Sequence, residues 1–201
     1  NRCTYCAIPY IRGKFVSREM ESLIKEAKEL VASGVKELIL IAQDTAYYGK
    51  DMGEYALAPL LNKLSLIDGI EWIRLHYAYP VGFPLDLLDT IRQRENVCNY
   101  LDMAIQHCNT RMLKLMRRGM TKEQLTELIA TIRDRVPGIY LRTTVMTGHP
   151  GETQADFDEL YEFVKEQRFE RMGVFAYSHQ SDTYCDRNYV DDVPQNVKIE
   201  R

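Results

Sequence analysis

Two cysteines near the start of the chain, Cys3 and Cys6, are separated by two residues. This spacing lets two thiolates converge on one metal ion or one iron–sulfur cluster, so it predicts a metal-binding loop. A redox pair, half of a zinc site and two unrelated thiols have the same spacing, and spacing alone leaves them open. The other cysteines are interpreted as ordinary thiols; they are Cys98, Cys108 and Cys185. A zinc site that adds His107 and Cys108 to the first pair is a weaker alternative, because it lacks paired spacing.

Polar residues also follow each predicted strand at the point where it ends. In parallel α/β folds the loops after the strands converge on one face, so we expect these side chains to cluster. Gln43 with Asp44 has a second interpretation as a helix cap, and the segment 148–152 as a plain turn. The full set is Gln43, Asp44, Thr45, Tyr47, Tyr48, Gly49, His76, Tyr77, Tyr79, Pro80, Gln106, His107, Cys108, 147–152, Tyr177, Ser178 and His179.

The apolar pattern behind the cysteine loop predicts alternating helices and strands. Helices are expected where apolar residues recur at helical spacing, over 17–34, 55–66, 84–92, 121–136 and 153–164. Strands are expected at the short apolar runs 37–42, 72–78, 100–106, 139–147 and 171–177, the first of them buried on both faces. Caps are predicted at Ser17, at Thr121 with Gln124, and at Thr153. This alternation predicts an α/β fold on a parallel sheet, either open and doubly wound or part of a barrel.

Length and composition restrict the class of protein. With 201 residues, 45% hydrophobic and 27% charged, the chain is expected to form one soluble domain with a sizeable core. No apolar run reaches the roughly 20 residues of a membrane span, which predicts no membrane association. The net charge of −3 makes direct nucleic-acid binding an unfavoured interpretation. Five cysteines without a disulfide pattern predict a reducing, cytoplasmic compartment.

The stretch from Cys3 to Lys14 reads Cys-Thr-Tyr-Cys-Ala-Ile-Pro-Tyr-Ile-Arg-Gly-Lys. It resembles the end of the Cys-x-x-x-Cys-x-x-Cys loop of radical S-adenosylmethionine (SAM) enzymes, most closely the methylthiotransferase branch. The resemblance implies that Cys3 and Cys6 are the second and third ligands of a four-iron four-sulfur cluster, with SAM on the fourth iron. The first ligand would lie four residues before Cys3, and Asn1 in place of Met suits a fragment.

The same resemblance implies a fold and a domain layout. Radical SAM domains are partial TIM-like (β/α) barrels whose first strand directly precedes the cysteine loop, so that strand is expected to be missing here. We expect a partial barrel over residues 1–180. The polar segment 181–201 is expected to be a tail or linker toward a carboxyl-terminal domain.

Further positions match the family's SAM-binding segments. Thr147 to Glu152 resembles a Gly-Phe-Pro-Gly-Glu segment that lies along SAM, although this chain has His149 in place of the Phe. Arg142 matches the family's strand arginine before the glycine turn. A ligand carboxylate would explain an arginine within a parallel strand, and a neighbouring protein Asp would explain it too. The cofactor-binding residues implied by the resemblance are Tyr5, Gln43, Gln106, Arg142, Gly148, Pro150, Gly151 and Glu152. The basic segment 111–119 also recurs in the family, and by itself it reads as a solvated helix face with core methionines.

The segment from Ile41 to Gly49, Ile-Ala-Gln-Asp-Thr-Ala-Tyr-Tyr-Gly, indicates the substrate. It resembles the branch that methylthiolates an aspartate of small-subunit ribosomal protein twelve. The implied reaction uses a 5′-deoxyadenosyl radical to remove a hydrogen from the aspartate β-carbon, and a methylthio group is then installed. The alternatives are a tRNA adenosine methylthiotransferase and a non-catalytic metal-binding βα domain.

The resemblance also implies what surrounds this chain. A second cluster is expected in an amino-terminal domain, an electron donor such as flavodoxin is expected to reduce the enzyme, and the enzyme is expected to be a monomer. On this interpretation the 201 residues are the central domain and are inactive alone. Methylthiolated product from the 201-residue chain would contradict that expectation.

Overall fold

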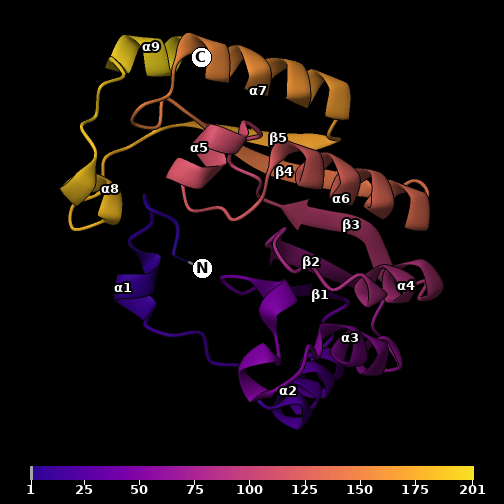
Figure 1. The fold of residues 1–201 in the computed structure, drawn as a ribbon. Helices are drawn as coiled ribbons and strands as arrows, with labels where there is room; N and C mark the ends of the chain where they lie inside the picture. The colour runs from indigo at the N-terminus through magenta and orange to yellow at the C-terminus, as the bar shows by residue number, and fades with distance from the viewer. Residues whose placement is uncertain (1) are drawn as a thin grey trace. The chain divides into compact units, whose positions relative to one another are not determined.

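The computed structural model of the protein describes residues 2–201; Asn1 lies outside the described residues. Five strands form one sheet in the order β1-β2-β3-β4-β5 (Figure 1). They are β1 (Glu37–Leu40), β2 (Trp72–Ala78), β3 (Val97–Met103), β4 (Tyr140–Thr147) and β5 (Arg171–Ala176). The first four strands pair in parallel, with Leu38 opposite Ile73 and Leu101 opposite Leu141. This confirms the predicted α/β class.

Helices alternate with these strands, as the apolar periodicity predicts. The longer ones are α2 (Met20–Ala32), α3 (Leu57–Ser65), α4 (Asp86–Gln93), α6 (Lys122–Arg135) and α7 (Gln154–Gln167). The shorter ones are α1 (Ile8–Arg12), η1 (Thr45–Tyr47), η2 (Lys50–Met52), α5 (Thr110–Leu115), α8 (Tyr184–Asn188) and α9 (Gln195–Glu200). Among the described residues, no helix is both long enough and apolar enough to cross a membrane.

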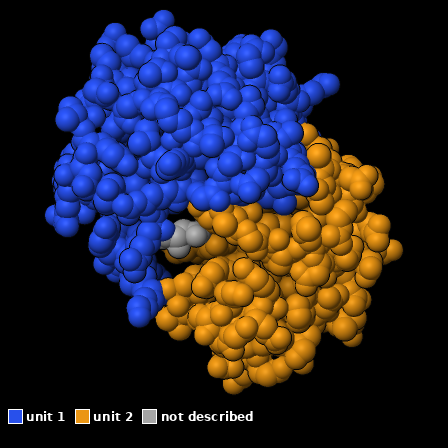
Figure 2. Space-filling model, in the orientation of Figure 1, with its two compact units in different colours: residues 1–14, 104–129, 143–201 blue, residues 15–103, 130–142 orange. Residues whose placement is uncertain are grey.

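The chain divides into two compact units, coloured separately in Figure 2. Unit 1 contains the described residues up to Lys14 together with 104–129 and 143–201. Unit 2 contains 15–103 and 130–142. The division passes through α6 and β4, and each unit is described by itself below.

Unit 2 packs one face of its strands into a core. On β2, Ile73 and Leu75 are buried, whereas Arg74 and His76, which alternate with them, are half-buried. On β1, Leu38 is buried but Ile39 is 47% exposed, so the prediction of a strand buried on both faces is wrong. The reason is that the helices cover one face, while the described residues of the unit leave the other face partly open.

Two of the three predicted caps are confirmed. Thr153 and Asp156 form a capping box at the start of α7, and Thr121 and Gln124 exchange hydrogen bonds before α6. The cap predicted at Ser17 is wrong, because α2 begins at Met20. The Ser17 hydroxyl instead donates to Asp51 at 2.5 Å and accepts from the backbone N–H of Gly49 at 2.9 Å.

The carboxyl-terminal segment of unit 1 differs from the predicted loop or linker. It forms α8 and α9, and Cys185, Val193 and Lys198 in it are buried. The Cys185 N–H donates to the Thr4 carbonyl at 2.9 Å, and the Thr147 hydroxyl donates to the Lys198 carbonyl at 3.3 Å. The segment therefore packs into unit 1, and its polar composition hid this because only a few of its residues face inward.

Candidate functional site

The cysteine loop lies in unit 1, where Cys3 and Cys6 bracket a single turn. The Cys6 N–H donates to the Cys3 carbonyl at 3.2 Å, and both side chains are half-buried. Burial raises the pKa of the Cys6 thiol, against a lowering by the backbone N–H of Ile8. Helix α1 follows directly, with Pro9 in its first turn. The loop thus presents two thiols from one turn, as the spacing predicts.

Thr4, between the two cysteines, is fully buried and anchors the loop. Its hydroxyl donates to the Leu115 carbonyl at 3.1 Å, and its N–H donates to the Met116 carbonyl at 3.2 Å. Its own carbonyl accepts from the Cys185 N–H at 2.9 Å. Three hydrogen bonds therefore fix the loop to the end of α5 and the start of α8. Nothing in the spacing of the cysteines indicated this role.

Arg118 is a second residue that the sequence interpretation missed. It is 5% exposed, its Nη1 lies 3.4 Å from the Cys3 sulfur, and its Nη2 donates to the Ala104 carbonyl. The prediction of a solvated face over 111–119 is therefore wrong for this residue, although Met112 and Met116 are core residues as expected. Arg118 therefore places a positive charge next to one of the two thiols of the loop.

Tyr5 lies in the same loop, and its ring meets the His149 ring edge to face at 6.2 Å between centroids. Burial raises the pKa of the Tyr5 hydroxyl, partly offset by the positive charge of Arg118. The phenol is therefore neutral at physiological pH. Tyr5 packs on the segment after β4, which contains four of the other predicted cofactor residues.

That segment begins with a tight turn at Gly148, which has a φ of 72°. A Cβ on Gly148 would lie 2.3 Å from Cγ of Lys198, so the position requires glycine. The Gly148 N–H donates to the Glu152 carboxylate at 2.9 Å, which closes the turn. Pro150 is buried and Gly151 is half-buried. The predicted cofactor residues of this segment therefore adjoin one another.

The Glu152 carboxylate is buried and serves the fold as well as the turn. It forms an ion pair with Arg201 at 2.5 Å, and its Oε2 lies 3.7 Å from Nε2 of His107. Oε2 of Glu152 and Nε2 of His107 are both buried, and neither makes a hydrogen bond to any described residue. The sequence left a plain turn open for 148–152, and these contacts support such a structural role for Glu152.

His149 replaces the aromatic residue of the motif and is fully buried. Its Nδ1 lies 2.9 Å from the Pro150 carbonyl and its Nε2 lies 3.2 Å from the Cys185 sulfur. Donation from Nδ1 to the carbonyl leaves Nε2 to accept from the thiol. Burial lowers the pKa of His149, so the ring is neutral at physiological pH. This ring fills the space among Tyr5, Tyr177 and Tyr189.

Gln106 lies beyond the end of β3 and has a φ of 69°. The predicted strand 100–106 is therefore displaced by three residues, because β3 runs from Val97 to Met103. Gln106 still joins the neighbouring strand through one bridge, in which its N–H donates to the Thr144 carbonyl at 2.8 Å. Its half-buried side chain belongs to unit 1, as do those of the cysteine loop and the turn at Gly148.

Gln43 and Arg142 belong to unit 2. Gln43 is exposed, and the carboxylate of the adjacent Asp44 accepts from the Tyr79 N–H at 3.1 Å. Arg142 donates to the buried carboxylate of Asp102 at 2.7 Å. A neighbouring Asp is the second explanation that the sequence left open for this arginine. The ligand roles of Gln43 and Arg142 stay predictions.

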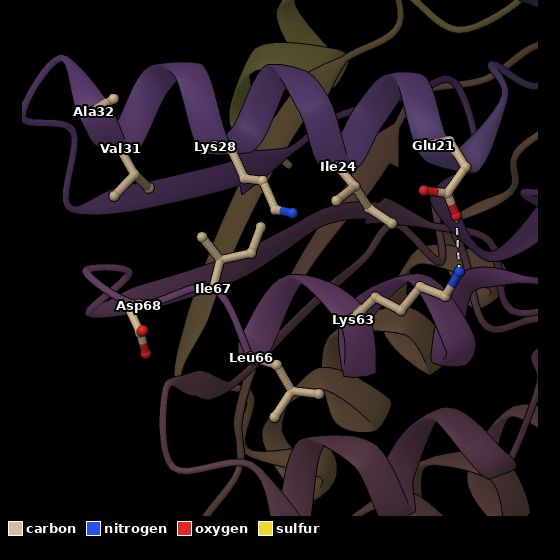
Figure 3. A pocket seen from close by; sticks show the side chains of 9 residues that line it. All are labelled: Glu21, Ile24, Lys28, Val31, Ala32, Lys63, Leu66, Ile67 and Asp68. Carbon is tan, nitrogen blue, oxygen red and sulfur yellow. Dashed lines mark hydrogen bonds and ion pairs between the residues drawn. The ribbon is translucent and has the colours of Figure 1, made fainter.

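A groove between α2 and α3 on unit 2 is separate from these residues (Figure 3). Apolar side chains such as Ile24, Val31 and Leu66 form much of its lining, and Glu21 pairs with Lys63 across it at 2.9 Å. None of the predicted cofactor residues lines this groove. It therefore does not contribute to the candidate site.

The thiols of Cys3 and Cys6 are of the chemical type that ligates iron–sulfur clusters. Within the part of the chain that the structure describes, no group of three His, Cys, Asp or Glu side chains is arranged to hold a metal ion. The rival zinc set of Cys3, Cys6, His107 and Cys108 is therefore not brought together. Cys3 and Cys6 supply two half-buried thiols beside a guanidinium, and a cluster would take its further ligands from elsewhere.

The structure combines a parallel βα sheet with a Cys-x-x-Cys loop. Comparison with known proteins identifies the family that has this combination. The Radical SAM superfamily matches residues 1–164, and the chain belongs to this superfamily. The chain is 59% identical over 200 residues to the ribosomal protein uS12 methylthiotransferase RimO of Porphyromonas gingivalis. It is 56% identical over 200 residues to the same enzyme of Cytophaga hutchinsonii. These matches cover 99% of this chain and 46% of each relative, so the chain spans about half the length of the curated relatives it matches.

Solved structures show the same fold. Coproporphyrinogen III oxidase (HemN) from Escherichia coli, a radical SAM enzyme, matches with a TM-score of 0.71 at 20% identity, over 100% of this chain and 47% of that chain. Methylornithine synthase (PylB) matches with a TM-score of 0.65 at 16% identity, over 99% of this chain and 56% of that chain. The expected partial (β/α) barrel of the radical SAM type is thereby confirmed.

Proposed function

We propose that the protein containing this chain is a radical SAM methylthiotransferase that modifies an aspartate of ribosomal protein uS12. The observation that carries this proposal is the 59% identity over 99% of the chain to a uS12 methylthiotransferase. The segment from Ile41 to Gly49, which resembles the ribosomal branch in sequence, supports the same substrate. The tRNA branch finds no comparable support among the relatives reported above.

In this proposal Cys3 and Cys6 ligate two irons of a four-iron four-sulfur cluster. When bound, the cluster with SAM supplies the electron and the 5′-deoxyadenosyl group that the reaction needs. The protein residues have separate tasks: Thr4 holds the loop in place through its three hydrogen bonds. Arg118 contacts the Cys3 sulfur and donates to the Ala104 carbonyl.

The SAM-binding residues of the proposal lie in both units. In unit 1, Tyr5, Gln106 and the turn Gly148, Pro150, Gly151 and Glu152 contribute polar groups and close backbone approach. In unit 2, Gln43 and Arg142 are candidates for the polar part of SAM. The support for these roles is their match to the family's segments and, in unit 1, their contacts with one another.

The remaining features concern the whole protein. We propose a second cluster in an amino-terminal domain, a flavodoxin-type electron donor, a monomeric enzyme and a cytoplasmic location. The proposal that residues 181–201 lead toward another domain stays as well, with this segment packed into unit 1. The length of the relatives, of which this chain covers 46%, supports further domains, and the other features rest on the resemblance to the family alone.

The test uses the whole protein with its clusters reconstituted, SAM, a reductant and purified uS12. The proposal predicts that mass spectrometry finds a methylthio group on one aspartate, together with 5′-deoxyadenosine. The variant Cys6→Ala should abolish both products, and Cys98→Ala, another half-buried thiol, should abolish neither. Modification of tRNA with no change in uS12 would contradict the proposed substrate.

A further inference from the structure

The segments at the carboxyl ends of β1 and β2 expose large side chains that have no role in the proposed cluster and SAM sites. We name them the tyrosine segments; they are residues 41–56 and 77–83 of unit 2. Tyr47 is 39% exposed, Tyr77 is 51% exposed, and Val81 is exposed as well. A single exposed apolar residue is ordinary, but several on adjoining segments mark an interaction surface.

Two hydrogen bonds hold the tyrosine segments together. The buried Asp44 carboxylate accepts from the Tyr79 N–H at 3.1 Å. The hydroxyl of Thr45, which is also buried, donates to the Tyr77 carbonyl at 3.4 Å. The exposed side chains therefore belong to one fixed surface and not to two independent loops.

Aromatic contacts extend this surface. The Tyr47 ring meets the Phe15 ring edge to face at 5.2 Å between centroids. Tyr55 reaches the second tyrosine segment, because a Cβ on Gly82 would lie 3.2 Å from the Tyr55 hydroxyl oxygen. Rigid aromatic side chains of this kind are enriched on surfaces that bind other proteins.

The backbone of Tyr77 is an independent sign of function. Its φ is 60°, in the left-handed region that a tyrosine rarely adopts. Half of its side chain is exposed, so burial of the ring contributes little to offset this unfavourable conformation. Backbone outliers of this kind concentrate at binding sites. The conformation therefore indicates that the Tyr77 ring is held in place for a partner.

The charges of the surface indicate what that partner is. Acidic residues outnumber basic ones in the tyrosine segments, with Asp44, Asp51 and Glu54 against Lys50. The Lys50 ammonium already lies 4.6 Å from the ring centre of Tyr55, so these aromatic faces accept a cation. A nucleic acid needs Lys and Arg side chains against its phosphates, and this surface does not supply them. It fits a protein segment that carries Lys or Arg side chains.

We propose that the tyrosine segments form the docking surface for the substrate protein, with Tyr47 and Tyr77 receiving Lys or Arg side chains near the target aspartate. This inference rests on the proposed function, in which the substrate is uS12. A protein that binds ribosomal RNA carries many such basic side chains, because they neutralise phosphates. The surface thereby selects its substrate by the charge around the aspartate and not by the aspartate itself.

The test measures the affinity of the whole, cluster-loaded protein for purified uS12 and for SAM. Tyr77→Ala should lose about tenfold in affinity for uS12, and Tyr77→Phe, which keeps an aromatic face, should retain most of it. Affinity for SAM should be unchanged in both variants. Tyr140→Ala is the matched control, because Tyr140 is also exposed but lies on β4, outside the tyrosine segments. It should bind uS12 as the wild type does.

A glycine at position 77 separates binding from a role in the fold. Tyr77→Gly removes the ring and also relieves the left-handed backbone. It should unfold at no lower urea concentration than the wild type, and yet it should lose about tenfold in affinity for uS12. Lowered stability with unchanged affinity would overturn the proposal, because Tyr77 would then serve the fold alone.

The chemistry of the partner is tested with uS12 in which the Lys and Arg residues next to the target aspartate are changed to Gln. This protein should bind the wild type about tenfold more weakly, and Tyr77→Ala should weaken its binding no further. Additive losses would overturn the pairing of Tyr77 with a basic side chain. A loss of affinity for oligouridylate in Tyr77→Ala, with affinity for uS12 kept, would assign the surface to RNA and refute the proposal.

Binding and modification are separate readouts, so this inference and the proposed function fail separately. If uS12 binds in a way that depends on Tyr77 but is never modified, the proposed function fails and the docking surface stands. If uS12 is modified, and Tyr77→Ala changes neither its KM nor its affinity, the docking surface fails and the function stands.

Discussion

Replacement of Thr4 by valine removes one hydroxyl from the centre of the cysteine loop and keeps the shape of the side chain. The lost hydrogen bond runs to the Leu115 carbonyl at 3.1 Å in a fully buried position. That carbonyl also accepts from the Tyr189 hydroxyl at 3.4 Å, so it is not left without a partner. The expected cost is therefore the net value of one hydrogen bond, about 1 kcal/mol, and not the larger penalty of an unsatisfied group.

The assay is amide hydrogen exchange at position 4 and at Cys185, whose N–H donates to the Thr4 carbonyl. A loss of about 1 kcal/mol in local stability should speed exchange at both amides about fivefold. Thr90→Val is the matched control, because it removes the hydroxyl that accepts from Asn62 at 3.1 Å in unit 2. That control should leave both amides unchanged. Unchanged exchange in Thr4→Val would refute the reasoning that this hydroxyl holds the loop.

Three further predictions concern stability and reactivity. Burial raises the pKa of Asp156, but the hydrogen bonds from its capping box and from an arginine lower it more, so the net pKa is lowered. The ionised Asp156 carboxylate therefore stabilises the fold fully above about pH 3.9, and this contribution is lost as the pH falls through the lowered pKa. The variant Asp156→Asn should lose less stability on acidification than the wild type, as urea titration would measure. Burial raises the pKa of Cys108 to about 12, so iodoacetamide at pH 8 should label the half-buried cysteines first, as peptide mass spectrometry would record. Gly148→Ala should cost about 1–3 kcal/mol of unfolding free energy, and more than Gly138→Ala, which has the same sign of φ but no atom within 4 Å of the new methyl. An equal loss of unfolding free energy in the two variants would show that Lys198 of α9 does not contact this turn closely enough to exclude a methyl group.

The elements of the fold were largely predictable because their signals are local. The strand 72–78 is found with the predicted limits, and the boxes at Thr153 and Thr121 begin their helices as expected. The cap predicted at Ser17 was wrong because a serine hydroxyl forms hydrogen bonds with a distant loop as readily as with the start of a helix. The predicted burial of Ile39 was wrong because an apolar run does not reveal whether a sheet has one covered face or two.

Only those site residues that belong to short sequence motifs could be predicted. The spacing of Cys3 and Cys6 and the turn at Gly148 identify themselves in this way. Thr4 and Arg118 could not be identified, because their roles depend on carbonyls and a sulfur from segments more than a hundred residues apart in sequence. The packing of α8 and α9 was missed for a related reason. A segment with few inward-facing residues has the composition of a linker.

The central claim is that Cys3 and Cys6 ligate an iron–sulfur cluster. The most direct test is anaerobic reconstitution of the whole protein and of the variants Cys3→Ala, Cys6→Ala and Cys98→Ala, followed by iron and sulfide counting and electron paramagnetic resonance. The account predicts that the first two variants lose about four irons per protein relative to the wild type, and that Cys98→Ala loses none. Full iron content and unchanged spectra in Cys3→Ala and Cys6→Ala would contradict it.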